Sequence, residues 1–503
     1  MAAAERRRRS EMAKQAPLSG ISDLRGFFRT NQTPIYFISP IAFNLLGIDR
    51  WVRRFYYVNY FDSFDGGHPC AFVPARTPHA QFGSIEDVCN YLLGHPQVAE
   101  FVASHEAAAP GARRGEALFV FFDEESERLA GEVGLKVALP SAELRHRLDS
   151  KIITTQLGDQ ADVPSVPNVL GRATSYLDLL ALAAEADLGE DLVVQTPYGD
   201  SGKTTFFVRA ERDWNADADQ MTSQELKVMR RINPRAVAVE ACITRHGTVV
   251  GPLMIDLTGH PELTPYRGGW CGNDIFPGAL SPANRERALQ FTRQLGDRLA
   301  VEGYRGLLEV DYLVDMVTDE LYLGELNPRL SGISSMTNVS ASAYADMPLF
   351  LFHLAEHLDV DYEIDVDDLR RRWGSDRLTD VWGQIILKEP DDGVELLTDA
   401  PRTGIWRLGK DGRISFSRPA ADWHDLADES EGFYLRVLGP GDYRYRGADL
   451  GILVTRTRLQ GDDGKLTDRC QTWIREIRSR FAGAPIVSPE QMPMPDALAF
   501  KAG

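Results

Sequence analysis

Two neighbouring segments carry the residues best suited to chemistry. Both are typical of strands joined in one hairpin: GLLEVDYLVD (306–315) and ELYLGELNP (320–328). Because successive side chains of a strand point to opposite faces, the polar residues of each strand share a face. These residues are Glu309, Asp311, Glu325 and Asn327. A short turn between the strands places Asp311 across from Gly324 or Glu325.

Carboxylates this close repel each other, and a cation between them would remove the repulsion. Asp311, Glu325 and Asn327 offer the hard oxygen ligands that suit Mg²⁺, which usually keeps water and phosphate oxygens as its other ligands. Arg329 follows two residues later and can hold a second anion with its planar guanidinium. The alternative is the solvated acidic face of an ordinary hairpin, with Pro328 ending the strand.

A glycine-rich stretch, QTPYGDSGKTTFFV (195–208), resembles a phosphate loop in composition. A Walker A loop needs a glycine, four residues and then Gly-Lys-Ser/Thr before a helix. Counting back from Gly202, the required glycine falls on Pro197, and the residues after Thr204 favour a strand. The stretch is therefore a glycine loop between two strands, which can cover phosphates with its backbone N–H groups. An ordinary hairpin turn is the alternative.

The composition disfavours some classes of partner. The 503-residue chain has a formal net charge of −18, from 55 basic and 73 acidic residues, which disfavours nonspecific binding to nucleic acid or to an anionic membrane. Its 5 cysteines form no Cys-x-x-Cys pair, and no run of apolar residues approaches the length of a spanning helix. The basic start has no apolar core after it, unlike a secretory signal. We therefore expect a cytoplasmic protein in a reducing compartment.

The order of predicted elements divides the chain into parts. They are a mostly disordered tail (1–30), a small α/β domain with a parallel sheet (31–148), a mixed α/β domain (149–358), a β-rich domain (359–481) and a loose Pro-rich end (482–503). The pattern over 142–163 predicts one helix that Pro164 and Pro167 stop. An acidic link, 359–368, marks the change to short strands.

The two hairpin segments resemble the metal-binding signature of the ATP-grasp superfamily, which has an acidic residue on one strand and Glu-x-Asn-x-Arg on the next. The segment RLDSKIITTQLGDQADVPSVPN is similar to the one that opens the ATP-grasp module in biotin-carboxylase-like members. The glycine loop and the strand VAVEACI then follow in the expected order. The resemblance covers roughly residues 31–358. It implies an ATP-grasp fold, mixed α/β and α+β, behind an N-terminal α/β domain and ahead of a β-rich C-terminal domain.

The resemblance also implies roles for individual residues. Mg²⁺, as two ions and with Mn²⁺ as an alternative, would be held by Asp311, Glu325 and Asn327. ATP would contact Lys151, Gln195, Gly199, Ser201, Gly202, Lys203, Glu240, Ala241 and Ile243. Among these, Lys151 would bind phosphate, and Glu240 with the backbone of 241–243 would hold adenine. Arg329 would stabilise the transferring phosphoryl group or a later oxyanion.

One position departs from the family pattern. The family usually has a lysine at the end of the strand before the glycine loop, where this chain has Gln195. Lys203, eight residues further on, would supply that charge from the loop and is therefore a candidate catalytic residue beside Arg329.

The family activates a carboxylate as an acyl phosphate, which a nucleophile then attacks. In the biotin carboxylase branch, Gln-Val-Glu-His follows the arginine, whereas this chain has LSGISSMTNVS (330–340) and no acid there. The chain also lacks a Met-Lys-Met biotin attachment site. We therefore expect an ATP-dependent carboxylate–amine ligase that forms an amide or peptide bond. The alternatives are a biotin-carboxylase-like enzyme and a noncatalytic ATP-binding protein.

Substrate residues are sought in the loop TPYRGGWCGNDIFPG (264–278) and just after the hairpin. Arg267 can clamp a carboxylate, Trp270 can shape a pocket and Ser331 can donate a hydrogen bond. A packed connecting loop and a turn-forming serine are the alternatives. The partners expected are a small-molecule carboxylate and amine, with no nucleic acid or membrane, in a possible homodimer.

Two other patterns are weighed against structural roles. HLAEH (353–357) has the His-x-x-Glu-His spelling of a zinc site, but no third ligand is evident, and an amphipathic helix is the simpler reading. Cys242 and Cys271 have no paired histidine pattern and read as small packing residues.

Overall fold

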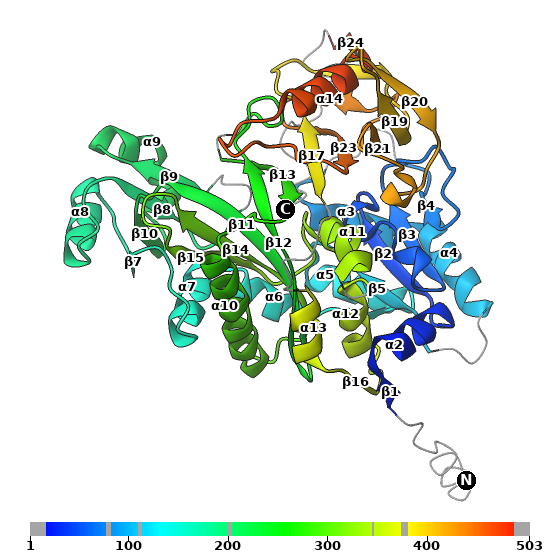
Figure 1. The fold of residues 1–503 in the computed structure, drawn as a ribbon, viewed down its shortest axis with the longest axis horizontal. Coiled ribbons are helices and arrows are strands. Elements are labelled where there is room, and N and C mark those ends of the chain that lie inside the picture. Colours follow the sequence, from blue (N-terminus) through cyan, green and yellow to red (C-terminus); the bar gives the residue numbers. More distant parts are fainter. Residues whose placement is uncertain are drawn as a thin grey trace, which may run out of the picture.

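The computed structural model of the chain describes residues 17–76, 82–108, 113–199, 204–266, 268–344, 347–373 and 381–486 (Figure 1). Its strands form a parallel sheet near the N-terminus, a small antiparallel sheet, and a large antiparallel sheet that runs into the C-terminal part. Short strand pairs complete the fold.

The parallel sheet has the strand order β4-β3-β2-β5-β6. Its strands are β2 (Ile35–Ser39), β3 (Phe55–Asn59), β4 (Ala71–Phe72), β5 (Glu116–Leu118) and β6 (Lys136–Val137). The helices of this part are α3 (Ile85–Leu93), α4 (Pro96–Ala107) and α5 (Glu124–Glu132). The predicted parallel sheet is confirmed, although β5 is shorter than the apolar run 117–123, whose remaining phenylalanines are buried without pairing.

The prediction that residues 1–30 form a mostly disordered tail is wrong for residues 17–30, which the structure describes. Helix α2 (Gly20–Arg29) buries Leu24 and Phe28, and β1 (Leu18–Ser19) pairs in parallel with β16 (Tyr362–Glu363). The sequence carries a signal for this helix, because Ile21, Leu24, Phe27 and Phe28 have the spacing of one helix face, and this face packs against the core.

The helix predicted over 142–163 is two helices, α6 (Ala142–Leu148) and α7 (Lys151–Gln160). The chain is extended at Ser150, the residue before α7. The backbone N–H of Lys151 then donates to the carbonyl of Pro197, 2.8 Å away in the glycine loop. This tertiary hydrogen bond competes with helix continuation and directs the start of α7 toward the loop.

The small antiparallel sheet has the order β7-β10-β8-β9. Its strands are β7 (Asn168–Gly171), β8 (Leu192–Gln195), β9 (Thr205–Val208) and β10 (Leu226–Arg230). Helices α8 (Tyr176–Glu185) and α9 (Glu211–Met221) share a buried core with one face of this sheet, through Val194, Phe206 and Val228. The strand–loop–strand prediction for 195–208 is confirmed by the pairing of β8 with β9.

The large antiparallel sheet has the order β15-β14-β11-β12-β13-β17-β23-β21-β19-β20. Its strands are β11 (Pro234–Thr244), β12 (Gly247–Thr258), β13 (Trp270–Ile275), β14 (Gly306–Asp315), β15 (Leu321–Asn327), β17 (Trp382–Lys388), β19 (Gly404–Leu408), β20 (Ile414–Arg418), β21 (Glu431–Arg436) and β23 (Asp449–Thr455). Because β13 pairs with β17, the sheet continues past the acidic link at 359–368.

Helices and short strands surround this sheet, as Figure 1 shows. They are α10 (Pro282–Val301), α11 (Ser334–Tyr344), α12 (Phe350–His357), α13 (Val366–Trp373) and α14 (Asp468–Arg478), with β18 (Glu395–Asp399), β22 (Tyr443–Arg444) and β24 (Ala482–Pro485). β24 pairs with β18, so the start of the segment predicted to be loose (482–503) is an ordered strand.

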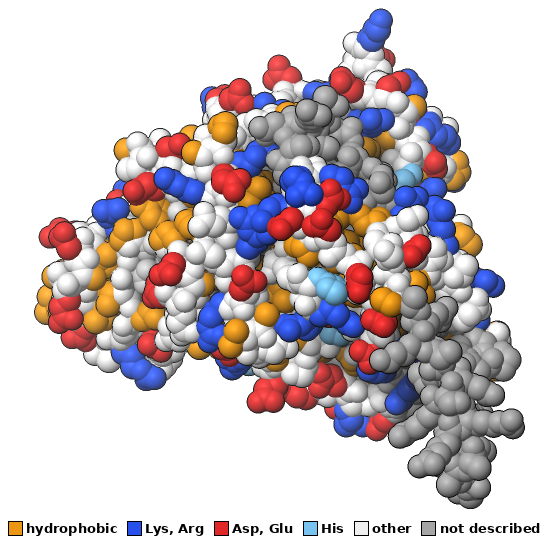
Figure 2. Space-filling view, turned by 60° about the horizontal axis from the view of Figure 1, so that its bottom comes forward, with side chains coloured by type: hydrophobic (Ala, Val, Ile, Leu, Met, Phe, Trp, Pro, Cys, Tyr) orange, Lys and Arg blue, Asp and Glu red, His pale blue; other side chains and the backbone are white. Residues whose placement is uncertain are grey.

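The surface charge is mixed. On the face shown in Figure 2, acidic and basic side chains lie among one another. Within the described ranges, no helix combines the length and apolar composition that crossing a bilayer requires.

The His-x-x-Glu-His spelling has a structural explanation. The backbone N–H of Leu307 donates to Nδ1 of His353 at 3.0 Å, and Nε2 of His353 lies 2.8 Å from the carbonyl of Ala138. His357 lies 3.2 Å from the carbonyl of Arg305 through its Nε2. In the part of the chain that the structure describes, no group of three or more His, Cys, Asp or Glu side chains is arranged to hold a metal ion. The two histidines therefore join α12 to the start of β14 and to the parallel sheet.

Burial makes these histidines sensitive to acid. It lowers the pKa of His353 well below its ordinary value and that of His357 from 6.5 to about 4. The unfolded chain therefore binds more protons between about pH 6.5 and 4, so the free energy of unfolding falls as the pH drops through this window. We expect a shallower fall in His357→Gln, which keeps a donor for Arg305. Urea unfolding at several pH values measures the difference; parallel curves would contradict the prediction.

A buried ion pair lies in the C-terminal part of the large sheet. Nζ of Lys388 lies 2.6 Å from Oδ1 of Asp449, and both residues are buried. Lys388→Met leaves a buried carboxylate without its cation and should lower the free energy of unfolding by about 3–5 kcal/mol. Lys388→Met/Asp449→Leu should recover most of that loss. Urea unfolding of both variants tests this, and a single variant as stable as the parent would contradict it.

Candidate active site

The predicted hairpin is β14 and β15, and its register brings the polar residues together. Asp311 lies opposite Glu325, and Glu309 lies opposite Asn327. Nδ2 of Asn327 donates to Oδ2 of Asp311 at 3.1 Å. The residues predicted to hold a metal therefore share one face at one end of the hairpin, with a bulge just beyond Asp311.

Lys151 joins this hairpin to the glycine loop. Its ammonium lies 2.7 Å from Oε1 of Glu325 and 2.7 Å from the carbonyl oxygen of Gly199. Lys151 is 3% exposed. The break between α6 and α7 thus delivers a buried cation to the carboxylates, next to the loop that is expected to cover phosphates.

The carboxylates of this face lie close to one another; Glu309 is buried, Asp311 is half-buried, and the side chain of Glu325 is 30% exposed. Burial, together with Glu309, Asp256 and Glu325, raises the pKa of Asp311 well above its ordinary value. Burial likewise raises the pKa of Glu309 to about 7. A cation would stabilise the charged forms. The two carboxylates suit Mg²⁺ that keeps phosphate and water ligands better than they suit a closed protein cage, and Asn327 would add its amide oxygen on giving up the hydrogen bond from Arg329.

The acidic face continues across the large sheet through residues that sequence reasoning missed. Strand register aligns Asp256 on β12 with Asn273 on β13 and Gln384 on β17. Nδ2 of Asn273 donates to Asp256 at 2.5 Å, and Nε2 of Gln384 donates to Oδ1 of Asn273 at 3.1 Å. Alternating polar residues were the available signal, but β17 lies more than 100 positions along the chain, and only the pairing shows which face its glutamine joins.

Glu240 lies on the same face, on β11, opposite Glu309. It is 1% exposed and accepts a hydrogen bond from Ser334 of α11. Burial raises its pKa to about 8. Ala241 and Ile243 pair with β12 on one side and β14 on the other, so the sheet already uses their backbone groups. The register between β11 and β12 shifts between Val239 and Ala241, and the adenine contacts assigned to Glu240, Ala241 and Ile243 stay a prediction.

The glycine loop is described up to Gly199 and again from Thr204. Gln195 ends β8, and its Nε2 donates to Oγ1 of Thr205 at 3.1 Å. Gly199 has φ 141°, and an added Cβ would lie 2.2 Å from the side chain of Thr204, so only glycine fits. The predicted ATP residues Ser201, Gly202 and Lys203 lie outside the described residues.

The three candidate substrate residues differ in where they lie relative to the polar face. Arg267 lies outside the described residues. Nε1 of Trp270 donates to Oδ1 of Asn273 at 3.1 Å, so this ring borders the polar face. Ser331 is fully buried, and its carbonyl accepts from Nδ2 of Asn44 at 2.7 Å, which brings the N-terminal domain to the edge of the site.

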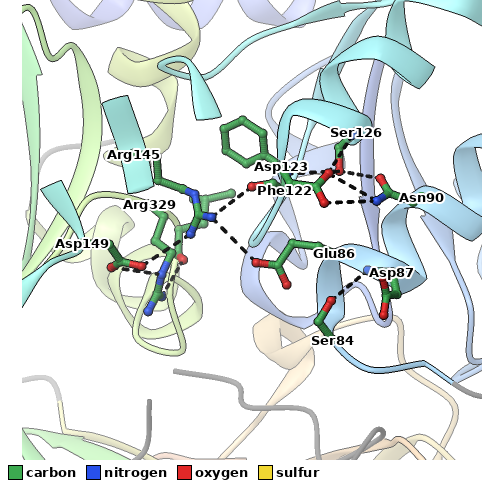
Figure 3. Close-up of polar contacts among 11 residues, drawn as sticks. Ser84, Glu86, Asp87, Asn90, Phe122, Asp123, Ser126, Arg145, Asp149 and Arg329 are labelled. Carbon is green, nitrogen blue, oxygen red and sulfur yellow. Dashed lines mark hydrogen bonds and ion pairs between the residues drawn. The ribbon is translucent and has the colours of Figure 1, made fainter. Parts of the chain in front are cut away.

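Arg329 lies between the hairpin and the N-terminal domain (Figure 3). Its Nη2 donates to Oδ1 of Asn327 at 2.7 Å, and its Nε lies 3.9 Å from Asp149. The guanidinium sits over the ring of Phe121, with Cζ 4.2 Å from the ring centroid. Arg145 of α6 lies beside it and contacts Asp149 and Glu86. Two buried arginines therefore flank the carboxylate end of the hairpin.

The buried cysteines fit packing roles. Cys242 and Cys271 are free and fully buried, and burial raises the pKa of both thiols. A protonated, enclosed thiol is a poor nucleophile.

Comparison with known proteins gives a distant relative in sequence. No protein-family model matches the chain. Pyruvate carboxylase of Staphylococcus aureus is 25% identical over 234 residues, which cover 44% of this chain and 19% of that protein. The match thus involves only about a fifth of the length of this curated relative.

Solved structures match over most of the chain. Biotin carboxylase of Campylobacter jejuni, in a complex with an ATP analogue, has a TM-score of 0.57 at 14% identity, covering 90% of this chain and 92% of its own. The biotin carboxylase domain dimer of Hydrogenobacter thermophilus 2-oxoglutarate carboxylase, with MgADP and bicarbonate, has a TM-score of 0.56 at 12% identity, covering 90% and 91%. N5-carboxyaminoimidazole synthase of Aspergillus clavatus, with ADP, has a TM-score of 0.52 at 10% identity, covering 86% and 96%.

These likenesses establish the fold. The parallel sheet, the small antiparallel sheet, the large antiparallel sheet and the C-terminal strands occur together in enzymes whose structures hold adenine nucleotides. The chain has the ATP-grasp fold in the arrangement of biotin carboxylase domains.

Proposed function

We propose that the protein is an ATP-dependent enzyme that activates a carboxylate as an acyl phosphate and joins it to an amine. The observation that carries the proposal is the facing pair Asp311 and Glu325, bridged by Lys151 to the carbonyl of Gly199 in the glycine loop. A noncatalytic nucleotide binder has little need to keep two repelling carboxylates opposite each other.

Asp311, Glu325 and Asn327 would hold Mg²⁺ bound to ATP. The metal would neutralise charge on the phosphates during transfer. The ammonium of Lys151 lies 2.7 Å from Glu325 and would hold the phosphates of ATP beside the residues that bind Mg²⁺. In the glycine loop, we assign phosphate contacts to Gly199 and to Ser201, Gly202 and Lys203, whose backbone and ammonium groups offer donors.

The chemistry has two steps. A carboxylate oxygen of the substrate attacks the γ-phosphorus of ATP, the bond from this phosphorus to the β–γ bridging oxygen breaks, and ADP leaves. The amine lone pair then attacks the acyl carbon, the carbon–oxygen bond to phosphate breaks, and the nitrogen loses a proton. Arg329, which donates to Asn327, would hold the phosphoryl oxygens in the first step. Loop closure would exclude water from the acyl phosphate.

Carboxylation of biotin with bicarbonate is the second candidate, because the similar structures include biotin carboxylase domains. The sequence of the segment after Arg329 favours the amine ligase. Residues 330–340 contain no acid, and the carbonyl of Gly332 accepts a hydrogen bond from Gln384 while Ser334 donates to Glu240. We also propose a homodimer, the state named for the Hydrogenobacter domain; sedimentation at twice the mass of one chain would support it.

The first test is phosphate release from MgATP in the presence of pooled carboxylates and amines. We expect release that needs a carboxylate–amine pair. Glu325→Gln should lower it by roughly 10²–10³-fold, because the variant loses a charged ligand of the Mg²⁺ that would neutralise the phosphates. Glu320→Gln, at the turn of the same hairpin, is the matched control and should release phosphate like the parent protein.

The other outcomes decide between the alternatives. Release that bicarbonate alone stimulates would replace the amine ligase by the carboxylase. Tight MgATP binding without release in any pool would leave a noncatalytic nucleotide-binding protein. Equal release by Glu325→Gln and the parent protein would remove the facing carboxylates from the mechanism.

A further inference from the structure

Lys227 is a buried lysine for which the sequence analysis found no role. It lies on β10 in the small sheet and is 1% exposed. On one side it pairs with Leu170 of β7, and on the other with Gln195 of β8. Lys227 therefore lies directly across from the position where the ATP-grasp resemblance expects a lysine and this chain has glutamine.

The face on which Lys227 lies is the one that meets the large sheet. On the opposite face, Val194 and Val228 pack with α8 and α9. On the face of Lys227, Met229 and Val193 pack with Tyr322 and Leu313 of the β14–β15 hairpin. The side chain of Lys227 thus lies on the face toward the large sheet, near enough to Glu325 and Lys151 for their charges to act on it.

The ammonium of Lys227 has no partner among the residues that the structure describes. No hydrogen bond or ion pair reaches it from any residue in the described ranges. Glu325 is close enough to favour its charged form, but that carboxylate is already bound by Lys151 at 2.7 Å. Burial lowers the pKa of Lys227 to about 8. A lysine so little exposed, with no partner among the described residues, is costly to keep charged. A lysine here is therefore best explained by an anion that binds beside it.

The register explains why Gln195 is tolerated. Directly opposed residues of an antiparallel pair have Cβ atoms about 5 Å apart on one face, which is within the reach of a lysine side chain. Gln195 itself donates to Thr205 and carries no charge. A cation moved to the neighbouring strand can reach the region that a cation at position 195 would reach.

We propose that Lys227 binds a phosphate group of the nucleotide, in the role that the resemblance assigns to a lysine at position 195. This inference rests on the proposed ATP-dependent function and adds to it a phosphate contact on β10. It also means that Lys203 need not replace the missing charge.

The test is the affinity for MgADP, measured by isothermal titration calorimetry at pH 7 on the full chain. Lys227→Met should weaken binding at least tenfold. Adding Gln195→Lys to that variant should restore most of the affinity, because it returns a cation to the same face. Lys410→Met, at an exposed turn, should bind like the parent protein. Adenosine, which has no phosphate, should compete equally well in the parent and in Lys227→Met.

The outcomes separate this inference from the proposed function. If the parent protein does not bind MgADP, the proposed function fails. If the parent binds and Lys227→Met binds equally well, the function stands and the role of Lys227 is wrong. A loss that Gln195→Lys does not restore would assign the effect to packing around residue 227 and would also overturn the inference. Thermal unfolding without nucleotide checks the fold; Lys227→Met should be at least as stable as the parent, because it removes an unpaired buried charge.

Discussion

The repulsion between Asp311 and Glu325 is the constraint to which the rest of the site responds. The two carboxylates face each other across β14 and β15, and burial together with the neighbouring carboxylates raises the pKa of Asp311. Asn327 donates to Asp311, and Lys151 pairs with Glu325. These two contacts, with the hydrogen bond from Lys151 to the carbonyl of Gly199, connect the hairpin to the start of α7 and to the glycine loop. The carboxylates, whose charged forms a cation would stabilise, are thereby linked to the glycine loop, which is expected to bind the phosphates.

The same constraint accounts for the position of helices α6 and α7. A single helix over 142–163 would carry Lys151 past the carboxylates. The break at Ser150 instead allows the backbone of Lys151 to bond Pro197 and its ammonium to reach Glu325. Asp149, in the same break, contacts both Arg145 and Arg329. One short irregular segment thus positions charges of both signs.

The large sheet makes the C-terminal part a component of the site. Its polar face runs from the hairpin through Asp256 and Asn273 to Gln384 on β17. Gln384 also bonds Ser335 of α11, so the segment after Arg329 is held against this face. Two buried lysines, Lys388 and Lys227, differ in whether an acidic residue pairs with them. Lys388 is neutralised by Asp449 within the fold, whereas Lys227 has no such partner in the described chain. The pair of Lys388 with Asp449 stabilises the fold. The charge of Lys227 lowers the stability of the fold at a place where a nucleotide would bind.

The sequence by itself determined the hairpin and its facing carboxylates, the strand–loop–strand form of 195–208, and the parallel N-terminal sheet. Strand alternation, turn composition and short apolar runs are local properties, and they can be read from neighbouring residues. The helix at Gly20–Arg29 also has a local signal, apolar residues at helical spacing, which the prediction of a disordered tail left out. Only the tertiary structure decided that Lys227 lies across from Gln195, that Lys151 reaches Glu325 and that Gln384 joins the acidic face. These facts depend on the register between strands far apart in the chain, and register is set by which faces are buried together rather than by any local pattern.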